Sequence, residues 1–226
     1  MAKGARRPES PLGAALDLLN RVEVVFYEGR SRGLRLLKEA ALIASYPKLK
    51  RDYDRLEVAL QGARALNLLL REGQRDRRIY QLFEELLEEL DVGANVNVNV
   101  SPSYLALGFK LKLIDLLGFG PILDRCSLCR EPLEAAEAEA EAEVEVEEPG
   151  LWFSPEAGGT VCGPCHRGAA DPALAGQAVE WRLVKALRMI LRLPLRRLSR
   201  LVLPEELIAQ GEELLDRFIA YHLQPI

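Results

Sequence analysis

The first part of the chain has a hydrophobic period of two residues. Between residues 21 and 26, apolar side chains alternate with polar ones apart from one interruption, which predicts a half-buried strand. Residues 28–33 are rich in glycine and arginine and favour a turn, and a second strand-like run covers residues 34–43. We therefore expect a hairpin. Two or three strands cannot close a barrel, so this sheet should be covered by the following helices or belong to a larger barrel.

After Tyr46 and Pro47 the period changes to about 3.6 residues, which is typical of amphipathic helices. We expect a first helix with an apolar face made of Leu49, Tyr53, Leu56 and Leu60. A second helix is predicted from Ile79 to Leu90. Its opposite face carries Glu84, Glu85, Glu88 and Glu89, which we interpret as a solvated surface and not as a catalytic or metal-binding group.

The rest of the chain is also predicted to be mainly helical. Residues 95–100 are interpreted as a low-complexity linker, and Ser101-Pro102 is typical of a helix start, with Gly118 as the stop signal. A further helix is expected over residues 179–193, where Pro194 ends it, and a last helix begins at Pro204. The pattern therefore predicts an α+β protein that is mostly helical.

The four cysteines of the chain form two Cys-x-x-Cys pairs, Cys126/Cys129 and Cys162/Cys165. Two intervening residues let both sulfurs of a pair point at one metal about 2.3 Å away, and two pairs complete a tetrahedral zinc site. Disulfides would need an oxidising compartment, and the N-terminal residues show no apolar signal segment. We expect one structural Zn²⁺, with a redox-active dithiol or plain core cysteines as the alternatives. His166 follows Cys165 directly and would have to displace a thiolate to bind, so the site should be closed.

The net charge of −4 conceals a strong segregation of charge along the chain. Residues 134–148, between the cysteine pairs, contain eight glutamates and no basic residue, and we expect them to form a disordered loop. Residues 181–200 contain seven basic residues and no acidic one. No apolar run reaches the length that a membrane span needs and no signal segment is evident, so we expect a cytoplasmic protein.

The basic residues are candidates for contact with nucleic acid, because each one can neutralise a phosphate. An ordinary solvated helix face is the alternative for those near the C-terminus. Phe26 and Tyr27 are candidate stacking platforms, and one of the two is expected to face the core. The candidate nucleic-acid contacts are Lys3, Arg6, Arg7, Arg30, Arg32, Arg35, Arg188, Arg192, Arg196, Arg197 and Arg200.

An enzyme is the competing class of protein. His166 and His222 are the only histidines, no nucleophile-base order is evident, and the glycine-rich segments lack a phosphate-loop pattern. We therefore expect no catalytic activity. A zinc-ribbon adaptor that binds protein but not DNA is the second alternative.

Several segments together resemble a known family. In chain order they read AKGARRPESPLG, VEVVFYEGR, LLKEAALIASYPKLKRD, FKLKLIDLLGFGPILDRCSLC and LWFSPEAGGTVCGPC. The combination of the segment ending in the first cysteine pair with FSPEAGG before the second pair is specific, and the likeness covers most of the chain. On these residues the chain is similar to the bacterial recombination mediator family RecO.

The resemblance implies an architecture and a set of partners. Residues 1–46 would be part of an OB-fold, and residues 47–226 a helical domain with an inserted zinc ribbon at 121–168. The family's role would be to bind single- and double-stranded DNA, to anneal complementary strands, and to help load the recombinase RecA onto strands covered by single-strand-binding protein. Its expected partners are RecR and the C-terminal tail of single-strand-binding protein, and the resemblance implies a nucleoid-associated location. Family members usually have further residues before the AKGARR segment, so we expect the first strands of the barrel to be missing here.

Overall fold

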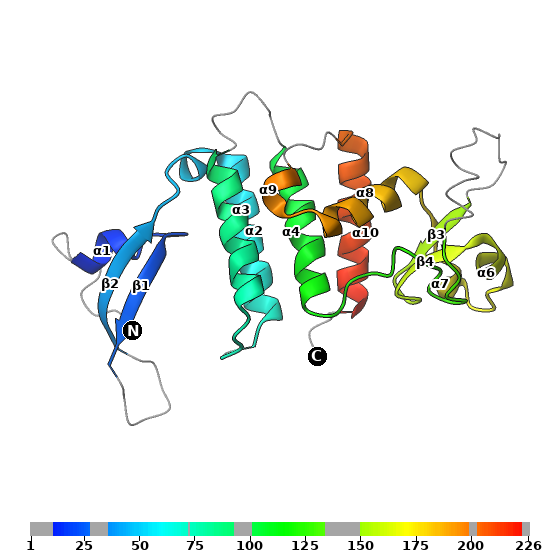
Figure 1. Cartoon of the computed structure of the whole chain (residues 1–226), viewed down its shortest axis with the longest axis horizontal. Coiled ribbons are helices and arrows are strands. Elements are labelled where there is room, and N and C mark those ends of the chain that lie inside the picture. Colours follow the sequence, from blue (N-terminus) through cyan, green and yellow to red (C-terminus); the bar gives the residue numbers. More distant parts are fainter. Residues whose placement is uncertain are drawn as a thin grey trace.

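The structure, a computed structural model, describes residues 11–27, 36–71, 73–92, 101–133, 150–198 and 203–222. It is elongated in Figure 1, with a small sheet at one end, a helical bundle in the middle and a second small sheet at the other end. In these ranges no helix combines the length and the apolar character that crossing a bilayer requires.

The helices are α1 (Pro11–Ala15), the 3-10 helix η1 (Leu49–Arg51), α2 (Tyr53–Leu69), α3 (Arg77–Val92), α4 (Pro102–Leu116), α6 (Gly163–Gly168), α7 (Pro172–Ala175), α8 (Trp181–Arg192), α9 (Leu195–Leu198) and α10 (Glu205–His222). The strands are β1 (Arg21–Phe26), β2 (Leu37–Ala44), β3 (Leu151–Ser154), β4 (Gly159–Cys162) and β5 (Gln177–Ala178).

The strand pairing of the predicted N-terminal hairpin is confirmed, and its predicted turn at residues 28–33 lies outside the described residues. Strands β1 and β2 pair antiparallel, with Val22 opposite Leu42, and α1 packs on β2. These described strands do not close a barrel. The expectation that Phe26 or Tyr27 faces the core is wrong, because both side chains are about half exposed, at 45% and 52%. With so few strands, the sheet has no second apolar layer to bury them.

Helix α4 is the centre of the bundle. It packs against α2, α3, α8, α9 and α10, and Figure 1 shows it flanked by α3 and α10. Its sequence is apolar on nearly every side, and residues as far apart around the helix as Leu105, Leu107 and Leu111 are buried. A helix that is hydrophobic all round is stable only when other helices surround it. Gly118, with φ +83°, follows the helix as its predicted stop.

The predicted apolar face of the first helix is confirmed only in part: Leu49 is buried and Leu56 packs against the core, but Tyr53 does not. Tyr53 is 77% exposed, whereas Arg55, Val58 and Ala59 are buried. Arg55 is tolerated there because its guanidinium donates to the carbonyl of Leu90, at 2.9 Å, and its Nε donates to an Asp52 carboxylate oxygen at 3.1 Å. Hydrophobicity alone could not identify a buried arginine.

Helix α3 buries the apolar face that the sequence predicts, including Ile79, Leu86 and Leu90. Its acidic face is only partly a solvated surface. The carboxylate of Glu84 forms an ion pair with Arg21 of β1, which ties the N-terminal sheet to the bundle. This long-range pair is a contact that the helical pattern does not contain.

Candidate metal centre and basic surface

The first cysteine pair lies in a tight turn. The N–H of Cys126 donates to the carbonyl of Glu131 at 2.9 Å, and the N–H of Arg130 donates back to the carbonyl of Cys126 at 3.0 Å. Arg130 has φ +69°, so the chain reverses sharply after Cys129. The turn therefore brings both thiols of the pair to one side.

The second pair follows β4 and begins α6, with Cys162 as the residue that precedes the helix. The turn between β3 and β4 lies directly against Ile122, shortly before the first cysteine pair. Gly159 has φ +150°, and a Cβ there would lie 2.2 Å from the carbonyl oxygen of Ile122. Only glycine allows this approach, which accounts for the last glycine of the FSPEAGG segment.

Hydrogen bonds around Thr160 join the segments that carry the two cysteine pairs. The N–H of Ser127 donates to the carbonyl of Thr160 at 2.7 Å, and the buried Thr160 hydroxyl lies 2.8 Å from the carbonyl of Arg125. The N–H of Cys162 also donates to Sγ of Cys126 at 3.4 Å. The cluster is therefore held by backbone contacts as well as by its sulfur atoms.

All four Sγ atoms lie within 4.8 Å of one another. Sγ of Cys129 and Sγ of Cys162 are 3.8 Å apart, which matches the edge of about 3.8 Å expected for a tetrahedron of sulfurs about 2.3 Å from its centre. Cys126 is buried, Cys129 is exposed, and the other two are intermediate. This donor set fits a tetrahedral thiolate-binding metal ion.

Electrostatics also favours a cation at this cluster. Burial raises the pKa of the Cys126 thiol, but N–H groups of Cys162, Cys129 and Leu128 that donate to its sulfur outweigh burial and lower the pKa to about 6. Burial and the neighbouring thiols raise the pKa of Cys165 to about 12. The thiolate of Cys126 forms readily, and its negative charge opposes ionisation of Cys165. A divalent cation would remove this opposition.

His166 is engaged elsewhere. Its ring stacks on Trp152, with centroids 4.1 Å apart and planes 13° apart, and its Nδ1 donates to the carbonyl of Ala175 at 3.0 Å. These contacts hold α6 against β3 and α7. The histidine therefore packs the ribbon and is not among the clustered ligand atoms.

The ribbon is fixed to the bundle by aromatic contacts. Phe153 packs on Phe218 of α10, with centroids 5.9 Å apart. Within α8, the guanidinium of Arg188 lies 5.7 Å from the centroid of the Trp181 ring. The charge of Arg188 also helps to lower the pKa of Asp124 in the ribbon, after the larger effect of the adjacent Arg125. Arg188 is half-buried, so this predicted nucleic-acid contact also has a structural role.

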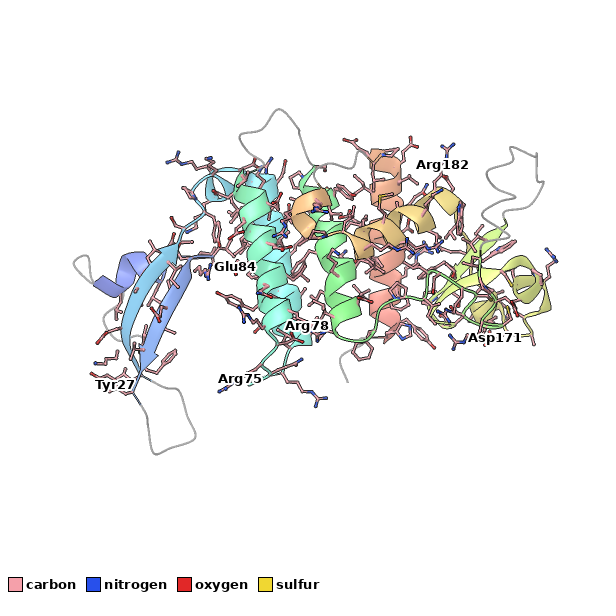
Figure 2. All side chains as sticks on the ribbon, viewed as in Figure 1. Tyr27, Arg75, Arg78, Glu84, Asp171 and Arg182 are labelled. Atoms are coloured by element: carbon pink, nitrogen blue, oxygen red, sulfur yellow. The ribbon has the colours of Figure 1, made fainter. Side chains whose placement is uncertain are left out.

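Helix α8 presents a basic ridge, which we define as Arg182, Lys185 and Arg192. The three residues are exposed and lie at spacings of three and seven, on one face of the helix. Figure 2 shows Arg182 at the outer surface of α8. Arg196 and Arg197 of α9 are exposed and continue the basic character past Pro194. Sequence reasoning included Arg188 and omitted Arg182 and Lys185, although the helical period contains the signal for them.

The remaining predicted nucleic-acid contacts lie outside the part of the chain that the structure describes. Lys3, Arg6, Arg7, Arg30, Arg32, Arg35 and Arg200 lie outside the described residues, as does the acidic segment 134–148.

Comparison with known proteins identifies the family. Residues 50–225 match the family model described as "Recombination protein O C terminal", and residues 1–46 match "Recombination protein O N terminal". The "DNA repair protein RecO" of Desulfatibacillum aliphaticivorans is 30% identical over 99% of this chain and 80% of its own length. Proteins of the same name from Caldanaerobacter subterraneus (24% identical, 99% of this chain, 80% of its own length) and Pelotomaculum thermopropionicum (26%, 99% and 77%) are also similar. On both family models and these relatives, the chain belongs to the recombination protein O (RecO) family.

Proposed function

We propose that this chain is a DNA repair protein that binds single- and double-stranded DNA through a basic surface and acts as a recombination mediator. The observation that carries the proposal is the basic ridge of Arg182, Lys185 and Arg192, continued by Arg196 and Arg197. No acidic residue occurs between residues 181 and 198. A run of exposed positive charge on one helix face favours phosphate binding, although the charge of Glu89 on α3 also acts on Arg196.

The packing of α8 supports this role. Leu183, Val184, Leu187 and Ile190 are buried on its opposite face, so the helix is a rigid support for the ridge. Arg182 and Arg192 are ten residues apart, which is about 15 Å along a helix. The ridge is thus long enough to contact more than one phosphate of a strand that runs along it.

We propose that the four cysteines hold one structural Zn²⁺. Cys126, Cys129, Cys162 and Cys165 would be its ligands, and the ion would supply no chemistry beyond holding the ribbon folded. The ribbon in turn packs against α10 through Phe153 and Phe218, and α10 contacts α8. The metal would therefore stabilise the end of the bundle that the ribbon meets.

The finer steps of the role come from the family resemblance. We propose that residues 1–46 are part of an OB-fold, that the protein anneals complementary strands, and that it helps load RecA onto strands covered by single-strand-binding protein. RecR and the tail of single-strand-binding protein are the proposed partners, and no catalytic step is proposed.

Titration of a labelled single strand and a labelled duplex with the whole chain, at low and at high salt, tests DNA binding. Affinity should fall steeply with salt, by about 0.7 log units per log unit of salt for each phosphate contact on a single strand and about 0.9 on a duplex. No salt-sensitive binding to either DNA would refute the proposal and would favour an adaptor that binds only protein.

A further inference from the structure

A pocket of about 230 Å³ lies where the N-terminal sheet meets the bundle. One wall comes from the turn before β1 and the start of that strand, another from α3, and Tyr46 closes it. Figure 2 shows Glu84 on the side of α3 that faces the sheet. The lining residues that matter here are Leu19, Arg21, Tyr46, Tyr80, Phe83 and Glu84.

Three of these residues are aromatic. Tyr46 is buried at 4% exposure, and Phe83 is held in place by Phe109, with ring centroids 5.9 Å apart. Tyr80 differs from both, because 55% of it is exposed. An exposed ring beside two fixed ones gives a planar ligand a surface on which to stack.

The polar side of the pocket has an unused donor. Nη1 of Arg21 contacts the carboxylate of Glu84, but Nε of Arg21 is buried and has no acceptor among the described residues. A buried donor without an acceptor is costly, and it usually indicates a water or a ligand that supplies one. The pocket therefore presents a free donor next to a carboxylate acceptor.

The turn that forms the wall is strained. Leu19 has φ +59°, a left-handed conformation that a branched side chain seldom adopts. The turn is held by hydrogen bonds of Asn20, whose Nδ2 donates to the carbonyl of Ala15 at 3.2 Å and whose Oδ1 accepts from Lys50 at 2.7 Å. Backbone strain that neighbouring contacts maintain tends to occur at binding sites.

The charges around the pocket are arranged in two zones. Glu84 lies in the lining, and the charge of Glu88 acts on Tyr46, whose pKa is raised by burial first and by this carboxylate second. These carboxylates disfavour a phosphate inside. Arg77 is exposed one turn before Tyr80 on the same side of α3, and Figure 2 shows Arg75 beyond the start of that helix. A phosphate is favoured outside, near these arginines.

We propose that this pocket takes one unstacked base of a single-stranded nucleic acid, with the ring on Tyr80 and the sugar-phosphate backbone toward Arg77 and Arg75. A base carries both hydrogen-bond donors and acceptors on its edge, so it can satisfy Nε of Arg21 and donate to Glu84. An apolar aromatic side chain of a peptide would fill the walls but would leave Nε unpaired. The inference rests on the proposed binding of DNA and adds a base-specific contact to it.

The experiment uses the whole chain and a single-stranded oligonucleotide that carries 2-aminopurine, whose fluorescence falls when it stacks on an aromatic ring. Tyr80→Ala should weaken single-strand binding about five- to 150-fold and abolish the fluorescence change, while duplex binding stays as in the unmodified chain. Tyr80→Phe keeps the ring and should restore both. Tyr53→Ala removes another strongly exposed tyrosine, from α2, and is the matched control.

A second oligonucleotide with abasic positions completes the test. On it, Tyr80→Ala and the unmodified chain should bind equally, because the base that stacks has been removed. If Tyr80→Ala binds the normal single strand as well as Tyr53→Ala does, or if it weakens single strand and duplex equally, the base pocket is overturned while the proposed DNA binding stands. If the unmodified chain binds no DNA at all, both are overturned.

Discussion

The basic ridge makes a quantitative prediction. Replacing Arg182 and Arg192 together by glutamate changes two exposed side chains on the outer face of α8 and leaves its buried face, which includes Leu183 and Leu187, intact. The free energy of unfolding should therefore change little, because exposed substitutions away from special contacts have small effects. DNA affinity should fall strongly, because two proposed phosphate contacts are lost.

The magnitude follows from counterion release. Each lost phosphate contact lowers the salt slope on single strands by about 0.7, so two lost contacts lower it by about 1.4. With the affinities of the variant and the unmodified chain taken as equal at 1 M salt, this change in slope gives the variant about a 25-fold lower affinity at about 0.1 M salt. Reversal of charge adds repulsion, so the loss should be at least this large.

The assay is fluorescence anisotropy of a labelled single strand over a series of salt concentrations. Replacing Arg51 and Arg64 by glutamate is the control, because both are exposed, lie in η1 and α2, and give the same change in net charge. The control variant should keep the slope of the unmodified chain. A ridge variant with an unchanged slope, or a control variant that loses as much, would refute a local phosphate contact at α8.

Three further predictions concern the metal, an acidic residue and a buried hydroxyl. Elemental analysis should give about one zinc per chain, and Cys126→Ser should lose it and unfold the ribbon while the circular dichroism of the helices remains; a metal-free protein with a folded ribbon would contradict this. Burial first, and then the charges of Glu85 and Glu88, raise the pKa of Glu89, so stability present at low pH is lost as pH rises through that pKa. Glu89→Gln should therefore raise Tm at neutral pH but not in acid, and equal effects at both would exclude this cause. Tyr104→Phe should leave the free energy of unfolding unchanged or raise it by up to about 1 kcal/mol, because the buried Tyr104 hydroxyl has no partner among the described residues. A clear loss of stability in urea unfolding would reveal a partner for that hydroxyl.

The sequence was a good guide wherever the chemistry is local. The strand β1, the apolar face of α3 and the stop at Gly118 each depend on neighbouring residues in the chain, and the structure confirms all three. The clustering of the four cysteines was also predicted from spacing alone, because each Cys-x-x-Cys turn orients its own two sulfurs.

Prediction failed where a contact joins distant segments. Arg55 can be buried because its guanidinium donates a hydrogen bond to the carbonyl of Leu90, and Tyr53 is exposed in its place. Glu84 belongs to a predicted solvated face, yet it pairs with Arg21. Hydrophobic periodicity measures the preference of each residue for water, and it contains no information about a partner 35 or 63 positions away in the chain.

The amino-acid sequence by itself determined the family, the N-terminal strands and the long helices, the grouping of the four cysteines and the segregation of charge. Only the tertiary structure decided which face of α8 points outward, and that Arg188 packs over Trp181. It also decided that Tyr80, Phe83 and Arg21 surround one pocket. The physical reason is that spacing along a helix fixes which residues share a face, whereas the packing of the whole chain fixes which face meets water and which meets a partner.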